Sequence, residues 1–286
     1  MHLSEIMVIL LSPMAEEIKK VAIITKLNST EAEHAARRII SVLCSNRIET
    51  YSIVPIGIDG CVQISPDKLR TIDLDLVVAV GGDGTTLRSF NLIPCGTPLF
   101  SINVGGHRGI LSEATIESIE ESLSSILAKD YIFESRLRIQ AIVGDNTIAR
   151  PALNEIICVR QSMTRTPMFS IQLMNDEINQ RMDGIIVSTP TGSTGHSLSL
   201  GGAVIHEALH CLTLVPIASV NRMPQLVIPV QQITIRCSHD VFLILDGQEV
   251  FDIIGGRPIK ITRHTSDAQF VRLRKRGLRQ LRKLGF

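Results

Sequence analysis

A single acidic residue lies in a glycine-rich corner that could support phosphoryl chemistry. Residues 76–89 read LVVAVGGDGTTLRS, so Asp83 sits between glycines directly after a short apolar run. Glycines allow a tight turn and a close approach of ligand to backbone, and N–H groups at a helix start favour phosphate. We predict a buried strand over 76–80 and a helix that begins near Leu87, capped by Thr85 or Thr86. This places Asp83 at the carboxyl end of a strand, where α/β sheets bind ligands.

Two common phosphate-binding motifs are excluded at this corner. A P-loop ends in Gly-Lys-Ser/Thr, and the corner contains no lysine. A dinucleotide fingerprint needs a third glycine three residues after Gly84, where the chain has Leu87. From the residues alone, Asp83 either serves chemistry or merely caps the turn.

A second run of small polar residues follows another expected strand, at 184–187. Residues 181–202 read RMDGIIVSTPTGSTGHSLSLGG, which places hydroxyl groups and glycines directly after the apolar stretch. Such a loop offers backbone N–H groups and short donors to a polar ligand. The alternative interpretation is a Ser/Thr-rich turn before a helix.

Taken together, these motifs resemble those of the NAD kinase family. Their order and spacing match the family over about residues 19–263. The glycine–aspartate corner alone is shared with diacylglycerol kinases, sphingosine kinases and phosphofructokinases, whereas the Thr/Ser/Gly run is more specific. The matching residues are Gly81-Gly82-Asp83-Gly84-Thr85, Asn154-Glu155, Asp183-Gly184, Thr189-Pro190-Thr191-Gly192-Ser193-Thr194 and Gly201-Gly202.

The resemblance implies an activity and its partners. It implies transfer of the γ-phosphoryl group of ATP to the 2′-hydroxyl of the adenosine ribose of NAD, giving NADP. Asp83 is then the catalytic residue, which takes the proton from the attacking hydroxyl, or orients it and helps to hold Mg²⁺. The divalent ion is carried by the nucleotide, with no protein metal site. A homodimer or homotetramer is implied, in which a neighbouring subunit completes the site.

The expected substrate-binding residues combine residue chemistry with the family's spacing. Glu155 can accept hydrogen bonds from a ribose diol, and Asn154 can both donate and accept. Arg88 either balances phosphate charge or is an exposed helix arginine, and Gln248 is either a contact or an ordinary hairpin residue. Arg165 matches by position only. The full set is Gly84, Arg88, Asn154, Glu155, Arg165, Arg181, Asp183, Thr194, Gly195, His196, Ser197, Leu198, Ser199 and Gln248.

Three residues depart from the family pattern. Family members usually read Thr-Ala-Tyr-Ser where this chain has Thr-Gly-His-Ser at 194–197. His196 has less ring area than tyrosine and adds a titratable group, and Gly195 leaves the backbone looser. Arg108 stands where leucine is common. These changes leave the expected fold intact and bear on nucleotide preference and affinity.

The surrounding pattern predicts an α/β N-terminal doubly wound domain and a mostly antiparallel, all-β sandwich C-terminal domain. Strands and helices alternate over about the first 130 residues, which is typical of a parallel sheet. Short strands separated by turns follow, with a hairpin turn at Asp246-Gly247. The expected strands are 21–25, 49–55, 73–80, 99–104, 136–143, 148–159, 169–174, 184–187, 231–237, 241–245 and 259–263, and the expected helices are 31–44 and 112–129.

We expect four segments along the chain. Residues 1–18 form an N-terminal extension, 19–133 an α/β phosphate-donor domain, and 134–263 a β-sandwich NAD-binding domain. Residues 264–286 form a basic segment that packs back on the first domain. A basic amphipathic helix over 272–286 either packs through its leucines or touches nucleic acid or anionic lipid, and we favour packing.

Composition excludes several classes of partner. The 286 residues carry a net charge of +1 and only 3% aromatic residues, which argues against nucleic acid. The six widely spaced cysteines contain no CxxC pair, so reduced thiols in the cytoplasm are expected. The apolar patch at 7–11 is too short for a membrane span, and no membrane partner is expected. Two functional alternatives stay open: a lipid or sugar kinase of the same superfamily, and a catalytically silent nucleotide-binding regulator.

Overall fold

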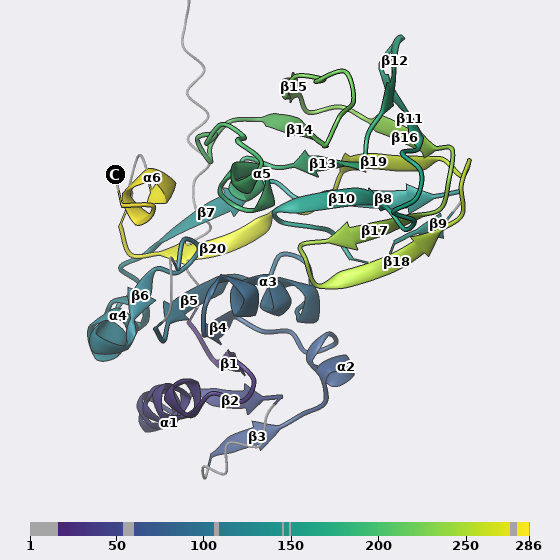
Figure 1. Cartoon of the computed structure of the whole chain (residues 1–286). Coiled ribbons are helices and arrows are strands. Elements are labelled where there is room, and N and C mark those ends of the chain that lie inside the picture. Colours follow the sequence, from purple (N-terminus) through teal and green to yellow (C-terminus); the bar gives the residue numbers. More distant parts are fainter. Residues whose placement is uncertain are drawn as a thin grey trace, which may run out of the picture.

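The structure is a computed structural model that describes residues 17–53, 60–105, 109–144, 146–148, 150–274 and 279–285. Most of the expected N-terminal extension, Arg108 and part of the basic C-terminal run lie outside these residues. Figure 1 shows an α/β part below an antiparallel β-sandwich, which confirms the predicted fold class.

The α/β part is built on an eight-stranded sheet in the order β3-β2-β1-β4-β5-β20-β7, with β6 also paired to β5. All its pairs are parallel except β20 with β7, which is antiparallel. The central strands are apolar on both sides because helices cover both faces. The strands are β1 (Lys20–Thr25), β2 (Glu49–Ser52), β3 (Cys61–Gln63), β4 (Leu76–Val80), β5 (Leu99–Asn103), β6 (Ala114–Thr115), β7 (Ile132–Arg136) and β20 (Ala268–Arg272).

Helices on opposite faces of this sheet make it doubly wound. On one face, α1 (Thr30–Ser45) and α4 (Ile119–Leu127) bury their apolar stripes against alternate strand residues. On the other face, α2 (Pro66–Leu69) and α3 (Asp83–Leu92) pack against the intervening strand residues. Ser29 is the N-cap of α1, since its hydroxyl accepts from the N–H of Ala32 at 3.3 Å.

Two stretches of predicted helix have other structures. The expected helix over 112–129 is shorter, because β6 and a 3₁₀ turn, η1 (Ile116–Ser118), precede α4. The expected helix over 272–286 is also shorter: Arg272 ends strand β20, and α6 covers Arg279–Lys283. Strand pairing overrides the local helical pattern at Ala114–Thr115, which pair with β5, and at Arg272, which pairs with Ile132 of β7.

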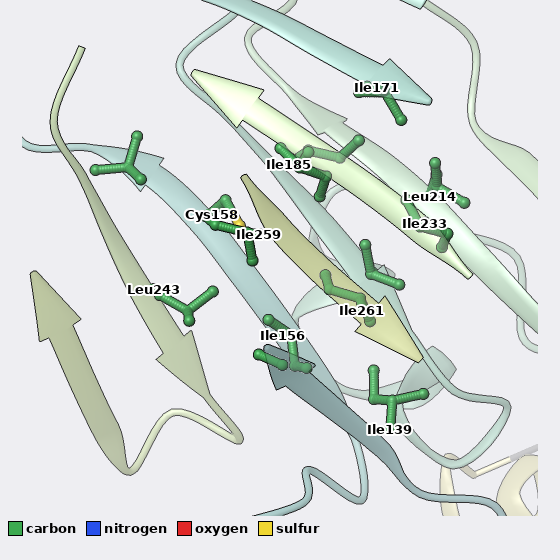
Figure 2. Close-up of a cluster of buried hydrophobic side chains, with 14 of the residues drawn as sticks. Ile139, Ile156, Cys158, Ile171, Ile185, Leu214, Ile233, Leu243, Ile259 and Ile261 are labelled. Atoms are coloured by element: carbon green, nitrogen blue, oxygen red, sulfur yellow. The ribbon is translucent and has the colours of Figure 1, made fainter. Parts of the chain in front are cut away.

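The sandwich consists of two six-stranded antiparallel sheets, in the orders β15-β14-β13-β10-β17-β18 and β12-β11-β16-β19-β8-β9. Alternate residues of both sheets point inward and form one isoleucine-rich core (Figure 2). The strands are β8 (Ile139–Val143), β9 (Asn146–Thr147), β10 (Glu155–Arg160), β11 (Met168–Leu173), β12 (Asp176–Arg181), β13 (Gly184–Ser188), β14 (Cys211–Ile217), β15 (Leu226–Pro229), β16 (Ile233–Cys237), β17 (Val241–Leu245), β18 (Glu249–Ile253) and β19 (Ile259–Arg263).

The Thr/Ser/Gly run leaves the sandwich after β13. It forms the 3₁₀ turn η2 (Thr191–Thr194) and the short helix α5 (His196–Ser199). Across the described residues, no helix is long and apolar enough to cross a membrane.

Candidate active site

Asp83 is the first residue of α3, with Gly82 as the N-cap. The predicted helix start near Leu87 and the predicted cap at Thr85 or Thr86 were therefore wrong. The N–H groups of Thr85 and Thr86 already donate to the carbonyl of Gly82, at 3.0 and 3.2 Å. The threonines thus belong to the first turn, because the glycine supplies the extended backbone that the cap position needs.

Both oxygens of the Asp83 carboxylate accept hydrogen bonds from the loop that follows β5. The N–H of Ile110 donates to Oδ2 at 3.0 Å and the N–H of Leu111 donates to Oδ1 at 2.9 Å. A carboxylate offers about four lone-pair sites, so this half-exposed side chain keeps acceptor capacity. Asp83 therefore holds the loop and also presents an oriented acceptor at the sheet edge.

A hollow of about 460 Å³ opens beside the glycine corner. Arg88 lines it, half-buried, with Nη2 donating to the carbonyl of Thr25 at 2.5 Å and Nε buried without a partner among the described residues. Burial lowers the pKa of Arg88. A half-buried cation with an unused donor beside a helix start suits a phosphate group. The lining residues are Lys26, Leu27, Gly82, Gly84, Thr85, Arg88 and Gly105.

Across the junction between the α/β part and the sandwich, Asp246 fixes the start of β10. It lies in the predicted turn between β17 and β18, at a positive φ of 50°. Its carboxylate accepts three consecutive N–H groups, from Leu153 at 2.8 Å, Asn154 at 2.7 Å and Glu155 at 3.1 Å. Burial raises the pKa of Asp246 to about 6, against the opposing effect of these bonds. The sequence indicated the hairpin but not this role.

Glu155 and Asn154 carry buried acceptor atoms at this position. Glu155 is 2% exposed, and its Oε1 lies 3.1 Å from Nδ1 of His196. Oε2 of Glu155 and Oδ1 of Asn154 are buried with no hydrogen-bond partner among the described residues. Burial, and then the charge of Asp246, raises the pKa of Glu155 to about 7, while His196 opposes the shift. Unsatisfied buried acceptors are costly, so this position suits a ligand with hydroxyl or amine donors.

A direct hydrogen bond joins the glycine corner to the β17–β18 hairpin. Nε2 of Gln248, just after the Asp246 turn, donates to the carbonyl of Gly84 at 2.8 Å. Below it, Leu153 packs into the core of the α/β part with Leu87 and Leu111. The glycine corner and the start of β10 are thus held against each other.

Comparison with known proteins places this arrangement in a family. Family models described as the ATP-NAD kinase N-terminal and C-terminal domains match residues 21–131 and 153–273. A protein named NAD kinase from Moorella thermoacetica is 30% identical over 266 residues, which span 90% of this chain and 85% of that protein. The chain belongs to the ATP-NAD kinase family. A Thermococcus sibiricus NAD kinase is also 30% identical, over 90% of this chain and 95% of its own length.

Solved structures of NAD kinases share the fold. An Archaeoglobus fulgidus NAD kinase in complex with ATP has a TM-score of 0.77 and 26% identity, covering 93% of this chain and 98% of that one. Yeast NADH kinase complexed with NADH has a TM-score of 0.84 at 20% identity, covering 94% and 87% of the two chains. The yeast structure bears on fold alone.

Most of the residues predicted from NAD kinase motifs gather around the junction. Direct contacts connect Glu155 to His196, and Gln248 to Gly84. In the turn that precedes His196, Thr194 is buried, and its hydroxyl donates to the carbonyl of Thr191 at 3.3 Å. On α5, Ser197 is buried, Leu198 is half-buried and Ser199 is exposed.

Two of the departures from the NAD kinase pattern converge on one carboxylate. His196 pairs with Oε1 of Glu155, and a Cβ added at Gly195 would come within 2.9 Å of Oε2. Glycine therefore leaves room for the carboxylate in the position it occupies. These two residues form one local arrangement with Glu155.

Three of the predicted substrate-binding residues lie far from Glu155 in the single chain. In the antiparallel pairing of β10 with β13, Glu155 is opposite Ser188. Asp183 directly precedes β13, at the opposite end of this pairing, where its Oδ2 lies 3.0 Å from Nη2 of Arg160. At about 3.4 Å per residue, this end is roughly 17 Å from Glu155. Arg181, which donates to the carbonyl of Thr166, and the exposed Arg165 are at the same end. Within one chain, these three residues therefore do not lie beside Asp83.

No group of three His, Cys, Asp or Glu side chains in the described part of the chain is arranged to hold a metal ion. All six cysteines are free.

Proposed function

We propose that this chain transfers the γ-phosphoryl group of ATP to the 2′-hydroxyl of the adenosine ribose of NAD, which gives NADP. The observation that carries the proposal is the pair of unsatisfied buried acceptors, Glu155 Oε2 and Asn154 Oδ1, held across the junction from Asp83. Ribose hydroxyls and the adenine amino group are donors that such acceptors would bind. Membership of the ATP-NAD kinase family supports the same reaction.

Asp83 is proposed as the catalytic residue. Its carboxylate orients the 2′-hydroxyl and accepts its proton as the ribose oxygen bonds to the γ-phosphorus and the bond to the β-phosphate oxygen breaks, releasing ADP. Phosphoryl transfer depends mainly on positioning and charge neutralisation. A carboxylate fixed by two backbone N–H groups is suited to positioning.

The hollow beside the glycine corner is proposed to hold the phosphates. Arg88 and Lys26 supply positive charge, and the start of α3 supplies N–H groups. A divalent ion, Mg²⁺ by our proposal, arrives with the nucleotide and neutralises phosphate charge. The lone Asp83 carboxylate, with acceptor capacity left over, fits a supporting contact to that ion.

A homodimer or homotetramer is proposed because part of the predicted site lies at the end of the sandwich that is farther from Asp83. A second copy would bring Arg165, Arg181 and Asp183 to the junction. The face of the β10 sheet that points away from the sandwich core is apolar, as expected for a surface that packs against another subunit. Val159, Ile217 and Ile244 are half-buried on this face, beside Ile157, Ile186 and Val215, which are already buried within the chain.

We also propose a cytoplasmic location. Six free thiols suit a reducing compartment, where ATP and NAD are available as substrates. No nucleic acid or membrane partner is part of the proposal.

A panel of acceptors tests the proposed function. Purified protein is incubated with Mg-ATP and NAD, NADH, diacylglycerol, sphingosine or fructose 6-phosphate, and ADP release is measured together with the phosphorylated product. The proposal expects NADP or NADPH as the main product. Turnover of a lipid or sugar alone would support the other kinase class, and NAD binding without any turnover would support a regulator.

A further inference from the structure

The C-terminal segment, residues 268–285, contacts loops on both sides of the proposed active site. Strand β20 lies between β5 and β7 in the sheet of the α/β part, and α6 follows it, drawn in yellow in Figure 1. The segment uses two buried polar side chains for these contacts, Arg272 and Gln280, which are 1% and 2% exposed.

Arg272 reaches the loop that holds Asp83. Its Nη1 donates to the carbonyl oxygen of Leu111 at 2.8 Å. The N–H of the same residue, Leu111, donates to Oδ1 of Asp83 at 2.9 Å. Arg272 therefore fixes a residue whose backbone in turn fixes the proposed catalytic carboxylate.

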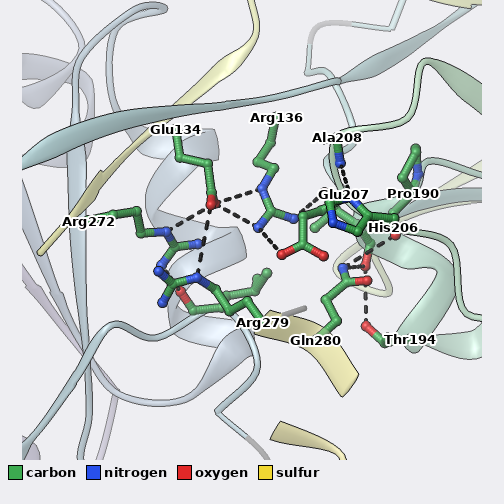
Figure 3. Close-up of polar contacts among 12 residues, drawn as sticks. Glu134, Arg136, Pro190, Thr194, His206, Glu207, Ala208, Arg272, Arg279 and Gln280 are labelled. Atoms are coloured by element: carbon green, nitrogen blue, oxygen red, sulfur yellow. Dashed lines mark hydrogen bonds and ion pairs between the residues drawn. The ribbon is translucent and has the colours of Figure 1, made fainter. Parts of the chain in front are cut away.

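Gln280 reaches the turn that carries Thr194. Its Nε2 donates to the carbonyls of Pro190 and Thr191, at 3.3 and 3.2 Å (Figure 3). The carbonyl of Thr191 also accepts from the hydroxyl of Thr194 at 3.3 Å. Gln280 thus holds the turn η2 directly before Gly195 and His196.

A charge-balanced network joins these two contacts. Glu134 accepts from Arg136 and Arg272 at 2.8 and 3.0 Å, and Arg136 meets Glu207 at 3.4 Å (Figure 3). Glu113 pairs with Arg279 and lies 3.6 Å from Arg272. Such buried networks are weak sources of stability but can fix one geometry. The guanidinium of Arg272 also stacks 4.3 Å from the Phe270 ring.

We propose that Arg272 and Gln280 are positioning residues of the active site. Arg272 keeps the 109–113 loop where it orients Asp83, and Gln280 keeps the η2 turn where it meets the nucleotide. The inference rests on the proposed function for its kinetic consequences, while the local geometry can be measured without turnover.

Two variants separate the two contacts. Gln280→Met removes the amide donor at similar volume, and Arg272→Lys keeps the charge but loses the planar fork that serves Leu111 and Glu134 together. The matched control is Gln269→Met in β20, because in the described residues the side chain of Gln269 only accepts a hydrogen bond from the Ser135 hydroxyl, away from both loops.

The readouts are the dissociation constant for NAD, kcat, and hydrogen exchange of peptides 109–115 and 189–196. Gln280→Met should weaken NAD binding about tenfold, the equivalent of about one hydrogen bond, and raise exchange in 189–196 only. Arg272→Lys should lower kcat about tenfold and raise exchange in 109–115, with NAD binding unchanged. The control should match the wild type in every readout.

The proposal is overturned if both variants fold, differ from the control only by a lower melting temperature, and match it in hydrogen exchange and NAD binding. If Arg272→Lys does not fold, Gln280→Met decides the matter alone. If the wild type makes no NADP, the proposed function fails, but the exchange patterns still test whether each residue holds its loop.

Discussion

Nε2 of Gln248 donates a 2.8 Å hydrogen bond to the carbonyl oxygen of Gly84. The bond connects the β17–β18 hairpin of the sandwich to the glycine corner of the α/β part. Asp246, two residues before Gln248, holds the backbone of Asn154 and Glu155. The same hairpin therefore sets the position of the proposed ribose-binding residues relative to Asp83.

Removing this bond should slow the reaction. We expect Gln248→Met to lower kcat/KM for NAD about tenfold, the cost of about one hydrogen bond, because the glycine corner loses its direct hydrogen bond to the β17–β18 hairpin. The value of kcat/KM is obtained from steady-state rates of NADP formation. The control is Gln140→Met, which breaks a 3.3 Å bond to Thr262 within a single sheet. Equal rates for the two variants would show that the Gln248 contact has no part in positioning.

Stability should fall as the pH rises through neutrality because of Glu155. Its folded pKa of about 7 lies above the ordinary value of 4.5, so the folded state holds the proton more tightly than the unfolded chain does. The resulting stabilisation is present below pH 4.5 and is lost as the pH passes 7, by at most about 3 kcal/mol at 1.36 kcal/mol per unit.

Glu155→Gln should remove this dependence, since an amide does not titrate. Urea unfolding of the two proteins at pH 5 and pH 8 gives the comparison. The variant should gain stability relative to the wild type at pH 8. A constant difference across that range would contradict the account, because Asp246 is present in both proteins.

His196 should contribute to nucleotide affinity through its exposed ring. Side-chain stacking on a base contributes about 1–3 kcal/mol, so His196→Ala should raise the KM for NAD about tenfold or more with little change in kcat. His239→Ala is the control, because the His239 ring hydrogen-bonds to the neighbouring Ser238, away from Glu155. An unchanged KM in His196→Ala would assign His196 to holding Glu155 rather than to binding.

The outer apolar face of the β10 sheet should join subunits. We expect Val159→Glu to convert an oligomer to a monomer, as seen by size-exclusion chromatography with light scattering, because a charge in a packed interface is unpaired. The KM for NAD should rise as well if a neighbour supplies Arg181 and Asp183. Val62→Glu, on the 47%-exposed Val62 of β3, is the control. A wild type that is already monomeric would contradict the prediction.

Local sequence signals predicted much of the α/β part. The helix expected over 31–44 was confirmed as α1, Thr30–Ser45, because its cap and its apolar spacing depend on neighbours within one helix. The start of α3 was missed because Gly82, without a side chain to cap, takes the N-cap position. Cap identity there depends on backbone conformation rather than on a hydroxyl.

Contacts between distant segments were harder to predict. Strand β20 was not predicted, because it pairs with β7, more than 130 residues away in the chain. Its last residue, Arg272, fell within the stretch 272–286 that was predicted as a helix. The hairpin at Asp246 was predicted, but its three bonds to residues 153–155 were not, since they join segments about 90 residues apart. The site residues and the domain limits 19–133 and 134–263 stay predictions.

The most direct test of the central claim is NADP formation by the wild type and by Asp83→Asn with ATP, Mg²⁺ and NAD, with NAD binding measured for both. We predict that the wild type makes NADP and that the variant binds NAD but turns over about 10²–10⁴-fold more slowly. Wild-type turnover by Asp83→Asn, or NAD binding by both proteins with no NADP from either, would contradict the account.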